Sequence, residues 1–382
     1  MKLNICFLMT AAFAALVGLL FTGCSPRPIA IGFQGPLTGS GADLGVQGRN
    51  GARLAVETIN AAGGVRGKPL RLEPHDDQSH QQVARELVRT FRKDGVEVVI
   101  GPMTSVAGVA VAELVAESGP LYVSPTVSTA EVSGRDDFFV RLQAAHDLSA
   151  AALGAYAVQD LGVARVAVIA DTTNAEYSTA YADAFSHGLA AEGGEVVREF
   201  AINLSQRGRW NHVIQAIARE DPQGVLIVGS ATDTARFSQA LRSVDHDWHL
   251  LGSGWAATEA LTTMGGEAVH EMTLAKMSYP ALETTPEGAD FQQRFLQRFG
   301  RVPSFAAGNA YDAVMVVARA LEDAGVDAEE LRTALVSLDR FDTLTGRLTV
   351  NEYGDVEPSA EIVRVERGQF VHVTDYGVSL GQ

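Results

Sequence analysis

The chain has 382 residues, of which 46% are hydrophobic and 20% are charged, and its formal net charge is −16. A chain this apolar can bury a large core, which excludes extended disorder, and its length predicts two domains of roughly 100 to 200 residues each. The acidic excess repels a phosphate backbone, so we predict no nucleic-acid partner.

The first 23 residues are typical of a signal peptide. Lys2 supplies the positive start, residues 5–20 form an apolar run, and the small residues Thr22 and Gly23 follow. The run is shorter than the roughly 20 apolar residues that span a bilayer, and no later segment approaches that length. We therefore predict export and no internal transmembrane helix.

Cys24 comes directly after this segment. Residues 21–24, Phe-Thr-Gly-Cys, resemble the lipobox of bacterial lipoproteins, although Leu is usual where this chain has Phe21. The resemblance implies acylation of the Cys24 thiol, with residues 24–28 as an exposed tether; ordinary secretion with an unmodified cysteine is the alternative. Cys6 lies in the removed segment, so the mature chain has no disulfide if Cys24 is acylated.

From residue 29 onward, short β-rich runs alternate with segments of helical periodicity. Ala52, Ala55, Val56 and Ile59, for example, recur at i, i+3, i+4 and i+7 and predict one apolar helical face. Such alternation predicts an α/β fold with parallel sheets and crossover helices. The strands predicted first are 29–33, 70–74, 96–100 and 121–123, with helices over 52–59, 84–91 and 105–117.

Around His146 the same pattern begins again, which predicts two similar lobes. The second series has predicted strands at 166–170, 196–202 and 225–228, and predicted helices at 177–192, 210–220 and 232–243. No short repeat or low-complexity segment interrupts either series.

Several short stretches, weak one by one, are specific in their order and spacing. Together they resemble the leucine/isoleucine/valine-binding protein family, the type I periplasmic binding proteins of ABC importers. The resemblance covers almost the whole mature chain and rests on residues 35–39, 59–67, 76–77, 100–102, 123–125 and 311–313.

The resemblance implies two α/β lobes of parallel sheet flanked by helices, three crossovers between them, and a ligand cleft. Such a cleft lies beyond the carboxyl ends of the strands. We place the crossovers near His146, Tyr279 and Thr345. The first lobe then comprises residues 29–146 and 280–345, and the second comprises residues 147–279 and 346–382.

Ser105 is the first candidate binding residue. It stands where a helix begins after a strand, so its hydroxyl and the free N–H groups of the first turn can bind a carboxylate. The resemblance implies the same role, since Ser105 matches the family's carboxylate-binding serine. The alternative is an ordinary helix-capping serine.

Three further residues match ligand-contacting positions of the family. Thr126 and Ser128 lie in a loop after a predicted strand, and Tyr177 follows the strand 166–170. The resemblance implies contacts of the first two with a carboxylate and an ammonium group, and closure of the tyrosine over the ligand. Ordinary turn chemistry and a partly buried aromatic ring are the alternatives.

One departure concerns the substrate. Branched-chain amino-acid binders pair the ligand ammonium with a Glu, whereas this chain has Gly254 at that place. A buried ammonium without an anion is costly. Either another carboxylate, such as Asp171 or Asp312, replaces the Glu, or the ligand is not an α-amino acid.

The pocket shape is also predicted to differ. Ala231 and Leu44 stand where the branched-chain binders have tyrosines, and Trp255 adds a large ring. Trp255 either stacks on the ligand or packs at the hinge between the lobes.

The sequence carries no pattern of a metal site or a catalytic centre. His75, Asp76, Asp77 and His80 lie close together, but without zinc spacing, and the two acids are better explained as caps of the following helix. There is no nucleophile elbow and no phosphate-binding loop. We predict a protein that is not an enzyme and has no metal and no cofactor.

The resemblance therefore implies a lipid-anchored protein of the periplasm or of the outer face of the cytoplasmic membrane. It is expected to capture an amino acid or a related small carboxylate by lobe closure and to present it to ABC permease subunits. The alternative is a ligand-sensing receptor domain that signals to a partner protein.

Overall fold

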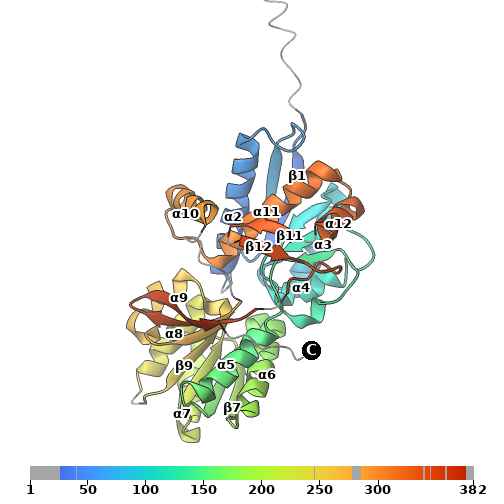
Figure 1. Cartoon of the computed structure of the whole chain (residues 1–382). Helices are drawn as coiled ribbons and strands as arrows, with labels where there is room; N and C mark the ends of the chain where they lie inside the picture. The colour runs from blue at the N-terminus through green and yellow to red at the C-terminus, as the bar shows by residue number, and fades with distance from the viewer. Residues whose placement is uncertain are drawn as a thin grey trace, which may run out of the picture.

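The computed structural model describes residues 26–39, 41–244, 246–277, 285–338, 340–344, 346–357 and 359–375. The predicted signal peptide, Cys24 and the crossover near Tyr279 lie outside these residues. Among the described residues, no helix is both long enough and apolar enough to cross a membrane. The chain forms two bodies, one above the other in Figure 1, which we call the first and the second lobe.

The first lobe is built around a parallel sheet in the order β2-β1-β3-β4-β5. Its short central strands are apolar and fully buried, as expected of a sheet covered by helices on both faces. The strands are β1 (Ile29–Gly35), β2 (Leu70–Asp76), β3 (Val98–Ile100), β4 (Leu121–Ser124) and β5 (Phe139–Arg141), with helices α2 (Ala42–Ala61), α3 (Gln81–Asp94) and α4 (Ser105–Ala112) between them.

The second lobe has a larger sheet in the order β14-β13-β10-β9-β8-β6-β7, in which β13 pairs antiparallel with both β10 and β14. Its parallel strands are β6 (Arg165–Asp171), β7 (Glu195–Ile202), β8 (Gly224–Val228), β9 (His249–Ser253) and β10 (Thr273–Lys276). The helices are α5 (Asp147–Gln159), α6 (Ala175–Ala191), α7 (Trp210–Glu220), α8 (Ala231–Arg242) and α9 (Glu259–Gly265), and the last strands are β13 (Glu361–Glu366) and β14 (Gln369–Asp375).

After β10 the chain returns to the first lobe. Helices α10 (Pro286–Phe299) and α11 (Phe305–Asp323) pack beside α2, and α12 (Ala328–Ser337) packs beside α11 (Figure 1). The approach of α11 to α2 requires a glycine, because a Cβ on Gly51 would lie 1.9 Å from the carbonyl oxygen of Ala307. Each lobe is therefore assembled from segments far apart in the sequence.

Most predicted strands and helices are confirmed to within a few residues. The helix predicted over 52–59 is longer than expected, since it begins at Ala42. The helix predicted over 105–117 is shorter than expected and ends at Ala112. There the amide of Leu114 bonds to the carbonyl oxygen of Val111, a tighter turn than the α-helical pattern. Five 3₁₀ helices complete the described elements: η1 (Ala130–Val132), η2 (Thr172–Asn174), η3 (Arg207–Arg209), η4 (Gly254–Ala256) and η5 (Gly266–Val269).

One predicted lobe boundary needs correction. Strands β11 (Arg340–Thr343) and β12 (Gly346–Thr349) form an antiparallel hairpin, and the amide of Arg141 in β5 donates to the carbonyl oxygen of Gly354 at 2.9 Å. The hairpin strands pair with each other, and the bond to Arg141 attaches Gly354 to the first lobe, although the sequence analysis assigned residues 346–382 to the second. We therefore propose that the third crossover follows Val356 and does not lie near Thr345, a residue outside the described part.

A buried ion pair ties this returning segment to the first sheet. The Arg141 side chain is 1% exposed, and its Nε lies 2.9 Å from Oδ1 of Asp355. Its other nitrogens donate to the carbonyl oxygen of Thr129 at 2.8 Å and to the hydroxyl of Ser133 at 2.7 Å. The guanidinium thus bonds to Asp355 and to two residues of the first lobe. The ion pair therefore anchors the returning segment to the first lobe before the proposed third crossover.

We expect Arg141→Met to lower the free energy of unfolding by about 3–5 kcal/mol, because it leaves the Asp355 carboxylate buried without its cation. Urea denaturation measures this difference. The matched control is Arg319→Met, since Arg319 forms an exposed pair with Asp323 and should change stability by less than about 1 kcal/mol. Equal effects of the two substitutions would contradict the anchoring role of Arg141.

Candidate functional site

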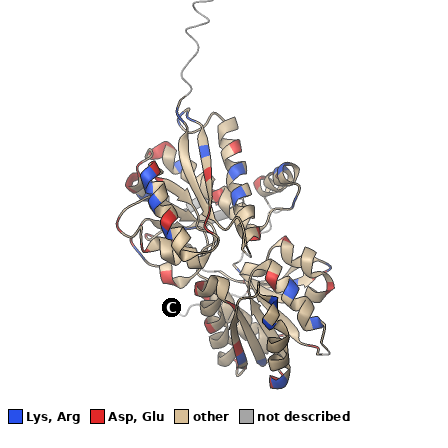
Figure 2. Ribbon diagram, turned by 180° about the vertical axis from the view of Figure 1, so that it is seen from behind, with Lys and Arg blue, Asp and Glu red and all other residues tan. Residues whose placement is uncertain are grey.

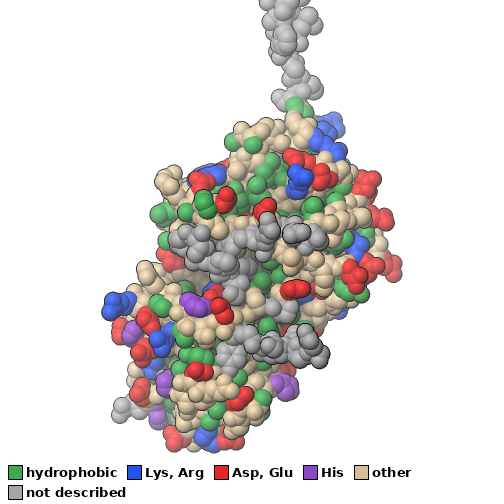
Figure 3. All heavy atoms as spheres, viewed as in Figure 1, with side chains coloured by type: hydrophobic (Ala, Val, Ile, Leu, Met, Phe, Trp, Pro, Cys, Tyr) green, Lys and Arg blue, Asp and Glu red, His purple; other side chains and the backbone are tan. Residues whose placement is uncertain are grey.

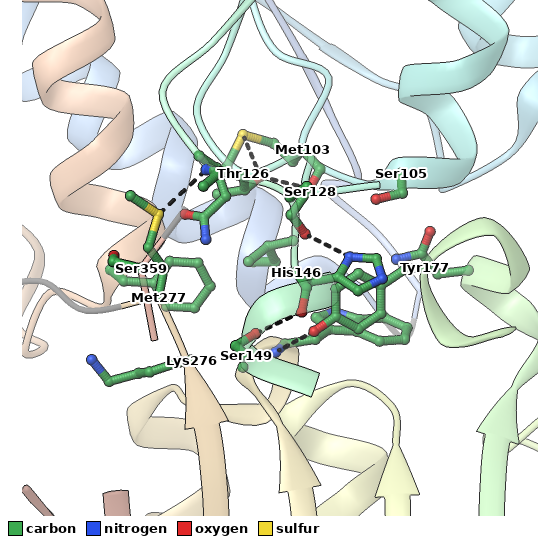
Figure 4. A pocket seen from close by; sticks show the side chains of 18 residues that line it. Met103, Ser105, Thr126, Ser128, His146, Ser149, Tyr177, Lys276, Met277 and Ser359 are labelled. Atoms are coloured by element: carbon green, nitrogen blue, oxygen red, sulfur yellow. Dashed lines mark hydrogen bonds between the residues drawn. The ribbon is translucent and has the colours of Figure 1, made fainter. Parts of the chain in front are cut away.

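A cavity of about 50 Å³ lies between the two lobes. Its walls come from loops at the carboxyl ends of strands in both lobes, as Figure 4 shows. Leu44, Met103, Ser105, Thr126 and Ser128 belong to the first lobe, and Asn174, Tyr177, Trp255 and Lys276 to the second. All five binding residues predicted from the sequence line this one cavity.

Ser105 is the first residue of α4, with Thr104 as the N-cap. Its side chain is 2% exposed, and its hydroxyl has no hydrogen-bond partner among the described residues. The next amide, of Val106, donates to Oδ1 of Asn174 in the second lobe at 2.9 Å. The first turn of α4 therefore offers the cavity a free hydroxyl, while one of its expected free N–H groups bonds to the opposite lobe.

Thr126 and Ser128 are both buried, and both already have partners. The hydroxyl of Thr126 donates to the carbonyl oxygen of Met103 at 2.6 Å, and that of Ser128 lies 3.4 Å from Nδ1 of His146. The carbonyl oxygen of Ser128 accepts the amide of His146 at 2.9 Å. Since oxygen has two lone pairs, both residues keep acceptor capacity toward the cavity, but their hydrogen bonds also shape the loop.

Three rings form the aromatic wall of the cavity. The ring of Tyr177 lies 4.7 Å from that of His146 and 5.7 Å from that of Trp255, the latter edge-on, and Tyr181 stacks behind both Tyr177 and His146. The hydroxyl of Tyr177 accepts the amide of Trp255 at 3.3 Å. Burial raises the pKa of Tyr177 to about 12, so the phenol stays neutral.

Trp255 in η4 is 6% exposed, and its Nε1 has no hydrogen-bond partner among the described residues. The ring packs edge-on against Tyr177 and lines the cavity, so stacking of Trp255 on a ligand stays a prediction. An indole N–H is a donor only, so this atom calls for an acceptor.

His146 is a site residue that the sequence analysis used only as a boundary marker. It is 5% exposed, occupies the N-cap position of α5 without a side-chain capping bond, and has no partner for Nε2 among the described residues. Burial, the largest cause, lowers the pKa of His146 to about 4, so the imidazole is neutral at physiological pH. No short-range pattern marked it, because its neighbours Tyr177 and Tyr181 are distant in sequence.

The place of the missing Glu is occupied by the backbone of Gly254 and the stem of Lys276. A Cβ on Gly254 would lie 3.1 Å from Cβ of Lys276. The ammonium of Lys276 pairs with Glu361, whose other oxygen lies 3.1 Å from Nδ1 of His372. Glu361, His372 and Asp375 could each offer a ligand atom to a metal ion, but the lysine already balances the buried carboxylate.

Neither substitute carboxylate considered above lines the cavity. Asp171 accepts the amides of Thr173 and Leu204 with Oδ1, and so fixes the loop after β6. Asp312 accepts the amide of Leu344 at 3.0 Å, and burial raises its pKa to about 8, which leaves it protonated at neutral pH. Both carboxyl groups have structural roles away from the cavity.

Three other residues considered in the sequence analysis are Leu44, Ala231 and Asp76. Leu44 lines the cavity, whereas Ala231 is buried at the start of α8 and does not. Asp76 accepts the amide of Leu37 at 2.8 Å and the hydroxyl of Thr38 at 2.6 Å, so it braces the loop after β1. The prediction that it caps α3 is wrong, because no side chain caps that helix.

The lobes also touch outside the cavity. Oγ1 of Thr258 in the second lobe donates to Oδ2 of Asp43 at 3.2 Å, and Gln81 on α3 donates to Glu176 on α6. With the bond from Val106 to Asn174, these contacts hold the two lobes together around the cavity. Met103 and Met277, which the sequence analysis also missed, are flexible apolar side chains suited to filling such a seam.

We expect the buried neutral His146 to make stability depend on pH. Its pKa is about 4 in the folded state and about 6.5 when unfolded, so the unfolded chain binds the extra proton between these values. Stability is therefore lost as the pH falls from 6.5 to 4, by up to about 3 kcal/mol from this group. Urea unfolding of the protein and of His146→Gln across this range measures the loss, and parallel pH profiles would contradict it.

Comparison with known proteins identifies the family. The sequence profile described as "Periplasmic binding protein" matches residues 28–369. The Leu/Ile/Val-binding protein BraC3 of Rhizobium johnstonii is 27% identical over 368 residues, covering 95% of this chain and 99% of that protein.

Two solved structures show the same fold. The leucine binding protein LivK of Thermotoga maritima has a TM-score of 0.82 at 24% identity, covering 92% of this chain and 99% of that one. A solute binding protein of an ABC transporter from Rhodopseudomonas palustris, in complex with 3,4-dihydroxy benzoic acid, has a TM-score of 0.79 at 21% identity, with 91% and 97% covered. The two-lobed fold and the match over most of its length establish that this chain belongs to the periplasmic binding protein family.

Proposed function

We propose that this protein is the substrate-binding component of an ABC importer, which captures an amino acid of the branched-chain type or a related small carboxylate. The observation that carries the proposal is a cavity between two lobes with unpartnered polar groups buried in its walls. The names of relatives support it, since BraC3 is called a Leu/Ile/Val-binding protein. Family membership implies a location outside the cytoplasm.

Lobe closure is the proposed mechanism. Ser105 from the first lobe and Tyr177 and Trp255 from the second face one cavity, so a ligand that contacts both lobes binds the closed form more tightly than the open form. That difference in affinity shifts the population toward closure, which permease subunits can then recognise. The bonds from Val106 to Asn174 and from Thr258 to Asp43 stabilise the same closed arrangement.

We propose binding without catalysis. The described polar groups of the cavity include no nucleophile activated by a base: the His146 imidazole lies a long 3.4 Å from the Ser128 hydroxyl, and its ring packs against Tyr177 and Tyr181. The relatives named above are binding proteins, so no observation favours the sensor alternative over transport.

We expect Ser105→Ala to weaken carboxylate binding by roughly tenfold or more, because a hydrogen bond to a charged group contributes about 1.5–3 kcal/mol. Isothermal titration calorimetry with the carboxylate that binds most tightly measures the change. Ser238→Ala is the matched control, since this buried hydroxyl on α8 also has no partner among the described residues but does not line the cavity. Unchanged affinity in Ser105→Ala would contradict the proposed site.

We also propose acylation of Cys24, supported by the resemblance of residues 21–24 to a lipobox. The wild-type protein should then fractionate with membranes and incorporate a labelled fatty acid, because two or more acyl chains give stable anchoring. Cys24→Ala should abolish both. Label incorporation by the Ala variant, or a soluble unlabelled wild type, would instead support ordinary secretion.

A further inference from the structure

We propose that the cavity selects carboxylates that lack an amino group, held between Ser105 and Trp255 with an apolar body against the aromatic wall. This inference rests on the proposed capture of small solutes and names their chemical class. The two-lobed fold by itself does not decide whether the ligand carries an amino group.

Two buried polar atoms of residues that line the cavity point to a ligand that accepts hydrogen bonds. Nε1 of Trp255 is a donor with no acceptor among the described residues, and the Ser105 hydroxyl is likewise unpartnered. A buried donor without a partner is costly, so each gains from a ligand oxygen. The two donors belong to opposite lobes, and a carboxylate has two oxygens, so one group can bond to both lobes at once.

The charges around the cavity oppose an ammonium group. Among the described residues that line it, the one with a full charge is Lys276, and none is Asp or Glu. Glu361 is near, but the ammonium of Lys276 and the ring of His372 already engage its two oxygens. A ligand ammonium would thus lose its hydration beside a cation and gain no anionic partner, which is unfavourable.

The two carboxyl groups that might have compensated are held elsewhere. Asp171 bonds to the amides of Thr173 and Leu204, and Asp312 bonds to the amide of Leu344. The neutral His146 adds no charge of either sign. A ligand with a single negative charge therefore matches the donors better than a zwitterion does.

Apolar and aromatic side chains make up much of the remaining wall, beside polar residues such as Asn174 and Ser149. The ring of Tyr177 adjoins those of His146 and Trp255, and Met103, Met277 and Phe305 add apolar side chains to the lining. Rings offer a face for stacking, and methionines adapt to the outline of the ligand. A branched or aromatic acid such as 4-methylpentanoate or 3-phenylpropanoate suits this surface.

The test compares ligands that differ only in the amino group. Calorimetry on the purified protein uses leucine against 4-methylpentanoate, and phenylalanine against 3-phenylpropanoate, with 3-methylbutylamine as the control without a carboxylate. We expect each amine-free acid to bind at least tenfold more tightly than its amino acid, and the amine not to bind. Tighter binding of the amino acids would overturn this inference and leave the proposed function intact. Failure of every carboxylate to bind would overturn both.

A pair of variants tests the donor from the second lobe. Trp255→Phe keeps a ring and removes Nε1–H, so we expect roughly tenfold weaker binding of the amine-free acids. Trp210→Phe is the matched control: its Nε1 is also buried and unpartnered among the described residues, but Trp210 lies on α7 away from the cavity. Equal affinities of the two variants would overturn the role of Trp255.

Discussion

Parallel strand pairing is the constraint on which the site depends. In a parallel sheet all strands end on the same edge, so the loops that follow them gather there. Ser105 follows β3, Thr126 and Ser128 follow β4, Tyr177 follows β6, and Trp255 follows β9. The two sheets turn these edges toward each other, which brings residues from four separate connections to one cavity. The binding site thus results from the sheet topology, and no single segment forms it.

The proposed closure also requires that each lobe keeps its internal packing while the cleft between the lobes opens and closes. With the third crossover placed after Val356, as we propose, residues 346–356 belong to the first lobe, where Arg141 holds Asp355. The last crossing is thereby confined to a few residues before β13, so closure can occur with little change inside either lobe. In the apolar core the lobes are nonetheless continuous, since one cluster of buried side chains includes Phe33 and Val123 as well as Val168 and Leu251.

The electrostatics of the surface and of the cavity serve different purposes. Acidic and basic residues are interspersed along the ribbon of both lobes in Figure 2, and their side chains are interspersed on the face in Figure 3, so the net charge of −16 is spread over the surface. Inside the cleft the groups are mostly neutral: a phenol with raised pKa, an imidazole with lowered pKa, hydroxyls and an indole. Neutral donors bind an anion without the large desolvation cost of a buried cation.

The sequence by itself determined the repeated strand and helix order, the two lobes and five residues of the cavity. Apolar periodicity and turn residues are local, and the family motifs at 100–102 and 123–125 fix where strands end. Only the tertiary structure decided the roles of His146, Lys276 and Asp355, because each depends on a partner distant in sequence: Ser128, Glu361 and Arg141, respectively. It also showed that Asp171 and Asp312 are engaged elsewhere, since hydrogen-bond partners and burial arise from packing and leave no mark in the local pattern.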